Sequence, residues 1–182
     1  MLRNKSTIST IGSIKSSPSA PGTTASSAAR CCWNFCFAFW TPKTALPWEA
    51  IRTRGSLRKS ANASKAQWKI VHGHHPIYSG GEHGDTAELI EDVLPLLHEH
   101  KVQAYFNGHD HDLQHMLEHK LNLFCTGAGS RVRFTFNTRY TKFSRSTPGF
   151  TTVNLTPDKM DVRMIDNQGR QIYAVTLPQG VV

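Results

Sequence analysis

The sequence predicts an α/β domain with a mixed sheet over residues 65–182, preceded by a disordered leader over residues 1–64. Three observations support this division. Short apolar runs flank one stretch of helical periodicity, as in a strand–helix–strand unit. Three further apolar runs, separated by turn sequences, follow near the end of the chain and predict a β-meander. Finally, all ten histidines lie between His72 and His119, inside the predicted domain.

The leader is basic and rich in serine and threonine. Residues 1–64 hold nine Lys/Arg and one acid and carry the whole charge of +8, since residues 65–182 hold twelve of each sign. This composition cannot bury enough apolar surface to fold alone. It resembles a targeting segment, such as an organelle transit peptide, and non-native sequence from another reading frame is the alternative. Because the basic excess lies outside the predicted domain, we expect no nucleic-acid partner.

The predicted domain begins with a strand at residues 68–71, where an apolar run precedes a loop rich in histidine and glycine. Asp85, with Glu88 three residues later, resembles a capping box and predicts that a helix begins there. Apolar residues at helical spacing follow, and Pro95 should kink or restart this helix. Five more strands are expected, at residues 102–106, 121–126, 150–155, 160–165 and 172–177.

Histidines follow two of the predicted buried strands. The first loop contains His74, and the second reads Gly108-His109-Asp110-His111. In open α/β sheets, sites form beyond the carboxyl ends of the strands. Neutral imidazole is a common ligand of transition metals, so two such loops predict a metal site.

Four other histidines, His98, His100, His115 and His119, are expected at the surface. The spacing of His111, His115 and His119 would suit one face of a helix, but no helix start precedes them, so we do not favour a helical metal site there.

Three motifs together resemble a known family. They are residues 68–79, Trp-Lys-Ile-Val-His-Gly-His-His-Pro-Ile-Tyr-Ser; residues 82–84, Glu-His-Gly; and residues 108–114, Gly-His-Asp-His-Asp-Leu-Gln. They are similar to the C-terminal half of a purple acid phosphatase of the small, tartrate-resistant type, within the calcineurin-like metallophosphoesterases. The resemblance covers about residues 64–178. It implies the C-terminal half of an α/β/β/α sandwich and a phosphomonoester substrate.

The resemblance also implies roles for individual residues. The family holds a ferric ion beside a second divalent ion (iron, zinc or manganese). His74 and His109 match ligands of the divalent ion, and His111 matches a ligand of the ferric ion. His83 matches a catalytic histidine that contacts the phosphate and serves in proton transfer to the leaving group.

The pattern of the family is incomplete in this chain. Its first three metal motifs, Asp-x-Gly, Gly-Asp-x-x-Tyr and Gly-Asn-His-[Asp/Glu], do not occur in the sequence, so three of seven expected ligands are present. We therefore expect an incomplete acid phosphatase site. The alternative is an inactive fragment that holds a single ion through three histidines.

Two expectations about partners follow from the halved fold and the hydropathy of the chain. Half of a sandwich leaves one sheet face uncovered, and an apolar uncovered face would favour self-association. No stretch approaches the roughly 18 apolar residues that span a bilayer, so no transmembrane segment is expected.

Overall fold

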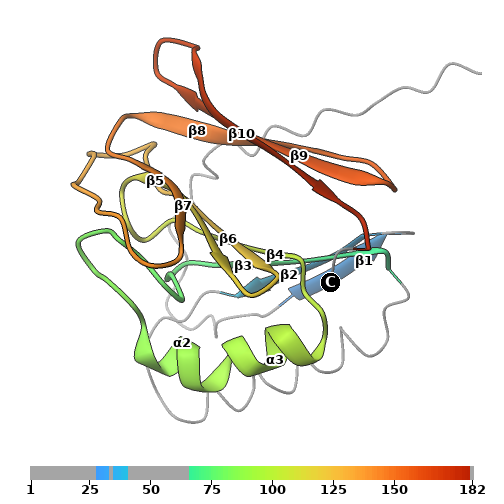
Figure 1. Ribbon diagram of the computed structural model, residues 1–182. Coiled ribbons are helices and arrows are strands. Elements are labelled where there is room, and N and C mark those ends of the chain that lie inside the picture. The colour runs from blue at the N-terminus through green and yellow to red at the C-terminus, as the bar shows by residue number, and fades with distance from the viewer. Residues whose placement is uncertain (1–27, 33–34, 41–65, 181–182) are drawn as a thin grey trace, which may run out of the picture.

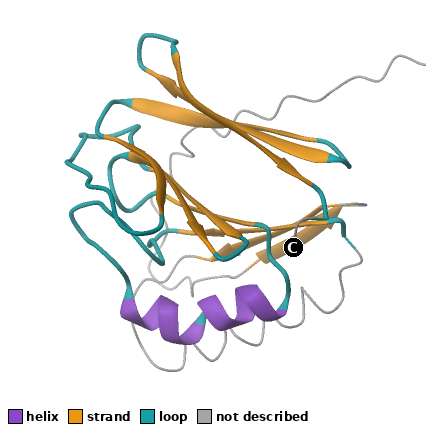
Figure 2. Ribbon diagram, in the orientation of Figure 1, coloured by secondary structure: helices purple, strands orange, loops and turns teal. Residues whose placement is uncertain are grey.

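The computed structural model describes residues 28–32, 35–40 and 66–180, which form three layers. Figure 1 shows a pair of helices, a mixed sheet in the middle and a small antiparallel sheet on the opposite side. Figure 2 shows that long loops cluster at one end of the mixed sheet. This layered mixture of helices and sheets confirms the predicted fold class.

The mixed sheet has seven strands. Their spatial order is β1 (Ala28–Cys32), β2 (Phe35–Trp40), β3 (Trp68–Gly73), β4 (Ala104–Asn107), β6 (Leu121–Thr126), β5 (Leu113–Glu118) and β7 (Thr141–Arg145). Strands β2, β3, β4 and β6 run parallel, whereas β1, β5 and β7 are antiparallel to their neighbours. The small sheet is antiparallel, with the order β10 (Gln171–Pro178), β9 (Lys159–Asp166) and β8 (Gly149–Leu155). Helices α2 (Ala87–Asp92) and α3 (Leu94–Glu99) connect β3 to β4.

The central strands are apolar on both faces because each face packs against another layer. Tyr105 and Leu123 lie in the core that includes the residues of the two helices, such as Leu97. Their chain neighbours Phe106 and Phe124 point the other way, into the core shared with β9. This double burial explains why β3, β4 and β6 read as continuous apolar runs in the sequence.

The break in the helical segment lies where the sequence predicts it, but the helix does not begin as predicted. Helix α3 begins at Leu94, next to Pro95, as expected for a restart at proline. The predicted capping box at Asp85 is wrong, because the residue at the N-cap of α2 is Thr86. The Asp85 carboxylate instead accepts a hydrogen bond from the backbone N–H of Ser79. Asp85 therefore holds the preceding loop rather than the helix end.

Strands β5 and β7 were not expected from the sequence. Strand β5 brings His115 into the interior with 3% of its surface exposed, so the expectation that His115 lies at the surface is wrong. His100, expected at the surface as well, is also buried. His119 is exposed, as expected.

Strands β1 and β2 lie within the segment that composition predicts to be a disordered leader. Strand β2 pairs in parallel with β3, from Phe35 opposite Trp68 to Trp40 opposite Gly73. The prediction of disorder is therefore wrong for these two segments. The aromatic residues of β2 favour a strand locally, although the leader as a whole is polar. The rest of the leader lies outside the described residues.

One sheet face is uncovered in the part of the chain that the structure describes. Helices and the small sheet cover the two faces of the mixed sheet (Figure 1). The small sheet has one open face, where Asp161 forms an ion pair with Lys159 and accepts a hydrogen bond from Thr176. Phe150 and Ile165, opposite each other on β8 and β9, belong to the same face, so the open face carries both polar and apolar side chains.

Candidate metal centre

The two histidine loops meet at the carboxyl ends of β3 and β4. These strands are parallel neighbours, so their ends lie at the same edge of the sheet. The carbonyl oxygen of His74 accepts hydrogen bonds from the backbone N–H groups of Gly108 (3.2 Å) and His109 (2.9 Å). The buried Tyr105 donates its hydroxyl to the carbonyl oxygen of His75 at 2.7 Å. The backbone thus fixes both loops beside each other.

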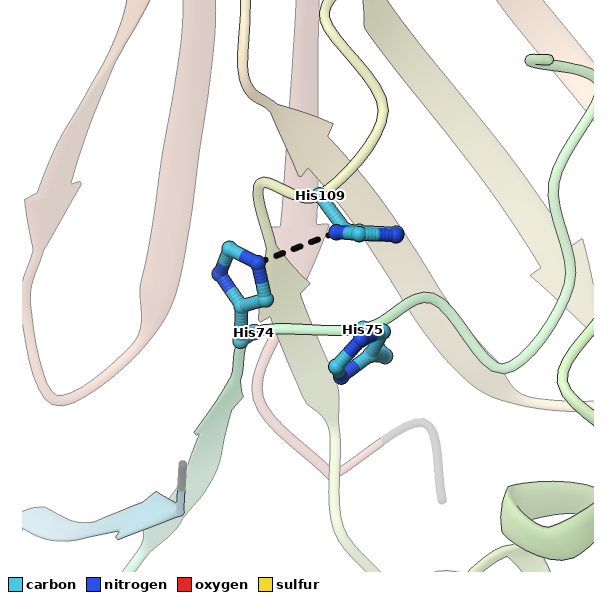
Figure 3. Close-up of side chains that lie close together, drawn as sticks. All are labelled: His74, His75 and His109. Carbon is cyan, nitrogen blue, oxygen red and sulfur yellow. Dashed lines mark hydrogen bonds between the residues drawn. The ribbon is translucent and has the colours of Figure 1, made fainter. Parts of the chain in front are cut away.

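Three imidazoles converge at this junction (Figure 3). His74, His75 and His109 each offer a ring nitrogen, and these atoms all lie within 4.8 Å of one another. His74 Nε2 and His109 Nδ1 are within hydrogen-bond distance of each other, at 3.0 Å. The ring centroids of His75 and His109 are 4.3 Å apart. The arrangement presents several nitrogen donors to one small region.

Burial and neighbouring imidazoles lower the pKa of two of these histidines. Burial, together with the neighbouring His75, His83 and His74, lowers the pKa of His109 to about 4. Burial also lowers the pKa of His75, with His74 and His83 adding to the effect. Neutral imidazole is the form that binds a metal ion, so the cluster is prepared to accept a cation at neutral pH.

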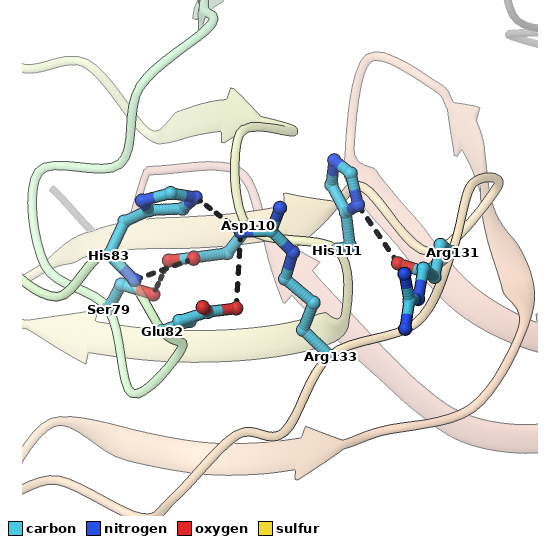
Figure 4. Close-up of polar contacts among 7 residues, drawn as sticks. All are labelled: Ser79, Glu82, His83, Asp110, His111, Arg131 and Arg133. Carbon is cyan, nitrogen blue, oxygen red and sulfur yellow. Dashed lines mark hydrogen bonds and ion pairs between the residues drawn. The ribbon is translucent and has the colours of Figure 1, made fainter.

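His83 lies on the rim of this group, beside an arginine (Figure 4). Its ring centroid is 4.1 Å from that of His109. Arg133 Nη1 lies 2.8 Å from His83 Nε2 and 3.1 Å from a carboxylate oxygen of Glu82. Because a guanidinium can only donate, His83 accepts at Nε2 in this arrangement. A cationic and an imidazole side chain therefore stand together next to the histidine cluster.

The structure does not place His111 with the three clustered imidazoles of His74, His75 and His109. Its Nδ1 lies 2.9 Å from the carbonyl oxygen of Arg131, and its own carbonyl oxygen accepts from the backbone N–H of Arg133. Figure 4 shows the His111 ring beside Arg131, joined to its carbonyl oxygen by a dashed line. Of the predicted ligands, His74 and His109 therefore lie together, and His111 lies outside their group.

The acidic residues of the second loop support the backbone. Asp110 is fully buried, and its carboxylate accepts hydrogen bonds from the Ser79 hydroxyl and from the backbone N–H of His83 at 3.1 Å. Asp112 is also fully buried, its carboxylate accepts from Gln114 Nε2, and burial raises its pKa. These carboxylates hold the loops in place and are not part of the imidazole group.

A two-ion site of the expected kind does not fit the described residues. The imidazole group offers neutral nitrogen donors and no carboxylate. A ferric ion is a hard cation that prefers oxygen donors, and two adjacent cations need anionic ligands to offset their charge. The donor set present suits a single divalent ion instead.

Sequence reasoning missed two residues of this region, His75 and Arg133. His75 directly follows a predicted ligand, so its position in the motif was visible but its side chain had no assigned role. Arg133 comes from a loop without periodicity, and the hydrogen bond from Phe136 N to Gly80 O joins that loop to the loop of His83. No pattern in the sequence predicts that pairing.

Comparisons with known proteins agree with the motifs. The calcineurin-like phosphoesterase family matches residues 38–113. Purple acid phosphatase 17 of Arabidopsis thaliana is 37% identical over 142 residues, which cover 69% of this chain and 42% of that protein. Tartrate-resistant acid phosphatase type 5 of Sus scrofa is 34% identical over 139 residues, covering 68% of this chain and 39% of the relative. The chain thus spans about two fifths of the length of these curated relatives.

The fold points the same way. The structure of the purple acid phosphatase PPD1 from yellow lupin (Lupinus luteus) seeds superposes with a TM-score of 0.70 at 15% identity, over 84% of this chain and 32% of that one. At this identity the likeness concerns the fold alone. The family likeness rests on the sequence matches, which make the chain similar to the purple acid phosphatases, including the tartrate-resistant type, and match residues 38–113 to the calcineurin-like phosphoesterases.

Proposed function

We propose that this chain carries the imidazole part of an acid phosphatase site for phosphomonoesters, and that the site is incomplete in its anionic metal ligands. One observation supports this most strongly: His83 and Arg133 stand beside the imidazole cluster at the carboxyl edge of the sheet. A guanidinium presents parallel N–H donors that match phosphate oxygens, so this edge suits a phosphate group.

The two residues have complementary roles in this proposal. Arg133 binds the phosphate oxygens, and in doing so it releases His83 Nε2, to which it donates in the free site. The released nitrogen can then carry a proton and donate it to the oxygen of the leaving group. Since a protonated imidazole is favoured in acid, this role suits a working pH below neutrality.

The metal chemistry of the relatives belongs to the completed site. Iron with a second divalent ion (iron, zinc or manganese) would supply Lewis acidity and a nucleophile there. This chain offers His74 and His109 toward such a site, and the resemblance adds His111. We expect slow turnover from the chain alone, because the anionic ligands of the family are not in its sequence.

An activity assay on the full chain tests the proposal. Hydrolysis of p-nitrophenyl phosphate is measured from pH 4 to 8, with iron, zinc or manganese added. Arg133→Ala should raise KM about tenfold or more, and His83→Asn should lower kcat by a factor of about 100 or more. Arg163→Ala, which removes an exposed guanidinium from β9, is the matched control. Turnover that both site variants leave unchanged would contradict the proposal.

A second candidate is a metal-binding module without hydrolysis. It is favoured by the composition of the imidazole group, which holds nitrogen donors alone while Asp110 and Asp112 are engaged in supporting the loops. This candidate predicts one bound ion per chain and no turnover at any pH. Metal analysis of the same preparation separates it from the first candidate.

Two statements concern partners. Within the described residues, no helix combines the length and apolar character needed to cross a membrane. Self-association is a further proposal: Phe134, Phe136 and Phe150 are exposed large hydrophobic side chains. Sedimentation velocity over a tenfold range of concentration tests it, and a constant sedimentation coefficient would contradict it.

A further inference from the structure

The third nitrogen donor of the imidazole group comes from a residue that the family resemblance leaves without a role. His74 and His109 match expected ligands, but the side chain that completes the group is His75. His111, the third histidine expected to bind metal, lies outside this group, and its Nδ1 lies 2.9 Å from the carbonyl oxygen of Arg131. Two sets of three ligands are therefore possible. Both contain His74 and His109, and the third ligand is either His75 or His111.

The spacing of the donors suits one ion between them. Zinc binds imidazole nitrogen at about 2.0–2.1 Å, so two nitrogens in a tetrahedral shell lie about 3.4 Å apart. His74 Nε2 and His109 Nδ1 are 3.0 Å apart, and the donor atoms of the whole group lie within 4.8 Å of one another. A three-nitrogen shell requires these spacings to move toward about 3.4 Å.

The backbone of all three residues is already held in place. The carbonyl oxygen of His74 receives two backbone hydrogen bonds, one of them from His109 itself. The carbonyl oxygen of His75 accepts a hydrogen bond from the Tyr105 hydroxyl. Tyr105 is fully buried in the core that includes residues of α2 and α3. A site whose backbone is fixed in advance loses little conformational freedom when an ion binds.

The chemistry of the donors selects the class of ion. Three neutral imidazoles suit zinc and similar divalent transition ions, and they suit a hard trivalent ion poorly. An open fourth position would remain for water or for an oxygen of a phosphate group. This is the ligand number of zinc sites that keep an exchangeable position.

We propose that this chain binds a single divalent ion of the zinc class through His74, His75 and His109, with His75 as the third ligand in place of His111. The proposal rests on the single-ion candidate above and adds the identity of its ligand set.

The experiment compares two single-histidine variants of the full chain. Zinc binding is measured by isothermal titration calorimetry, and cobalt(II) absorption reports the coordination geometry. The unaltered chain should bind one ion. His75→Ala should weaken zinc binding at least tenfold and change the cobalt spectrum, since even losing an outer-shell partner costs that much. His111→Ala and the exposed His119→Ala should stay within about twofold of the unaltered chain.

The outcomes test the assignment of His75 as a ligand separately from the binding of a single ion. Loss of binding in His111→Ala with retention in His75→Ala would overturn the ligand assignment while the single-ion candidate stands. A chain that binds no zinc would overturn both. His75→Asn is the second variant if His75→Ala unfolds, with circular dichroism as the check on folding.

Discussion

Buried His115 should make the unaltered protein less stable in acid, and replacing it by glutamine should abolish this effect. His115 lies on β5 with 3% of its surface exposed, stacked on Phe124 at 4.4 Å. Its Nε2 donates to Asn122 Oδ1 (3.0 Å), and its Nδ1 accepts from the Tyr173 hydroxyl (2.7 Å). This neutral tautomer satisfies both nitrogens and joins the mixed sheet to the small sheet.

Burial lowers the pKa of His115 to about 4, from an ordinary value of 6.5, and the nearby Lys142 acts in the same direction. The unfolded chain therefore takes up a proton near pH 6.5, whereas the folded chain does so only near pH 4. The stabilisation is complete above pH 6.5 and is lost as the pH falls through this window to about 4. Between pH 7 and 4.5 the loss from this residue is about 2 kcal/mol.

Urea denaturation at pH 7 and pH 4.5, followed by circular dichroism, measures the effect. Carboxylates titrate in both proteins, so the readout is the difference in unfolding free energy between the unaltered chain and His115→Gln. That difference should shrink by about 2 kcal/mol in acid. An unchanged difference at the two pH values would refute the reasoning. NMR titration of the His115 ring provides an independent check.

Two further predictions concern the loops at the site. A Cβ at Gly127 would overlap the carbonyl oxygens of Gly108 and Asp110, so Gly127→Ala should lower the melting temperature and weaken zinc binding. Gly129→Ala, with open space around it, is the control, and equal effects at both positions would contradict this account. Asp110→Asn should destabilise the chain by about 1–3 kcal/mol in urea, because the Ser79 hydroxyl loses a buried charged acceptor. An unchanged unfolding midpoint would contradict that role.

The sequence predicts the parallel strands β3, β4 and β6 well because they are buried on both faces, whereas the parallel strand β2 was not expected. The prediction for residues 121–126 coincides with β6, and Pro95 lies at the start of α3 as expected. Strand β5 escaped prediction because polar side chains fill its buried positions. Gln114 donates to Ser79 and Asp112, and His115 bonds to Tyr173, so no apolar alternation is visible.

Site residues that directly follow a predicted strand could be predicted from the sequence. Contacts between loops that are distant in the sequence could not. His74 and His109 follow neighbouring parallel strands, and the structure places them in hydrogen-bond contact. The pairing of His83 with Arg133 depends on a loop fifty residues away and has no local pattern. The orientation of His111 toward Arg131 is likewise a result of loop packing.

The central claim is that the imidazoles of His74, His75 and His109 hold one divalent ion at this sheet edge, without the anionic ligands of the family. A crystal structure of the zinc-loaded chain, with anomalous scattering at the zinc edge, tests it most directly. We predict one peak within about 2.0–2.1 Å of nitrogens from His74, His75 and His109. Two peaks about 3.5–4 Å apart, with His111 bound to one of them, would contradict the claim.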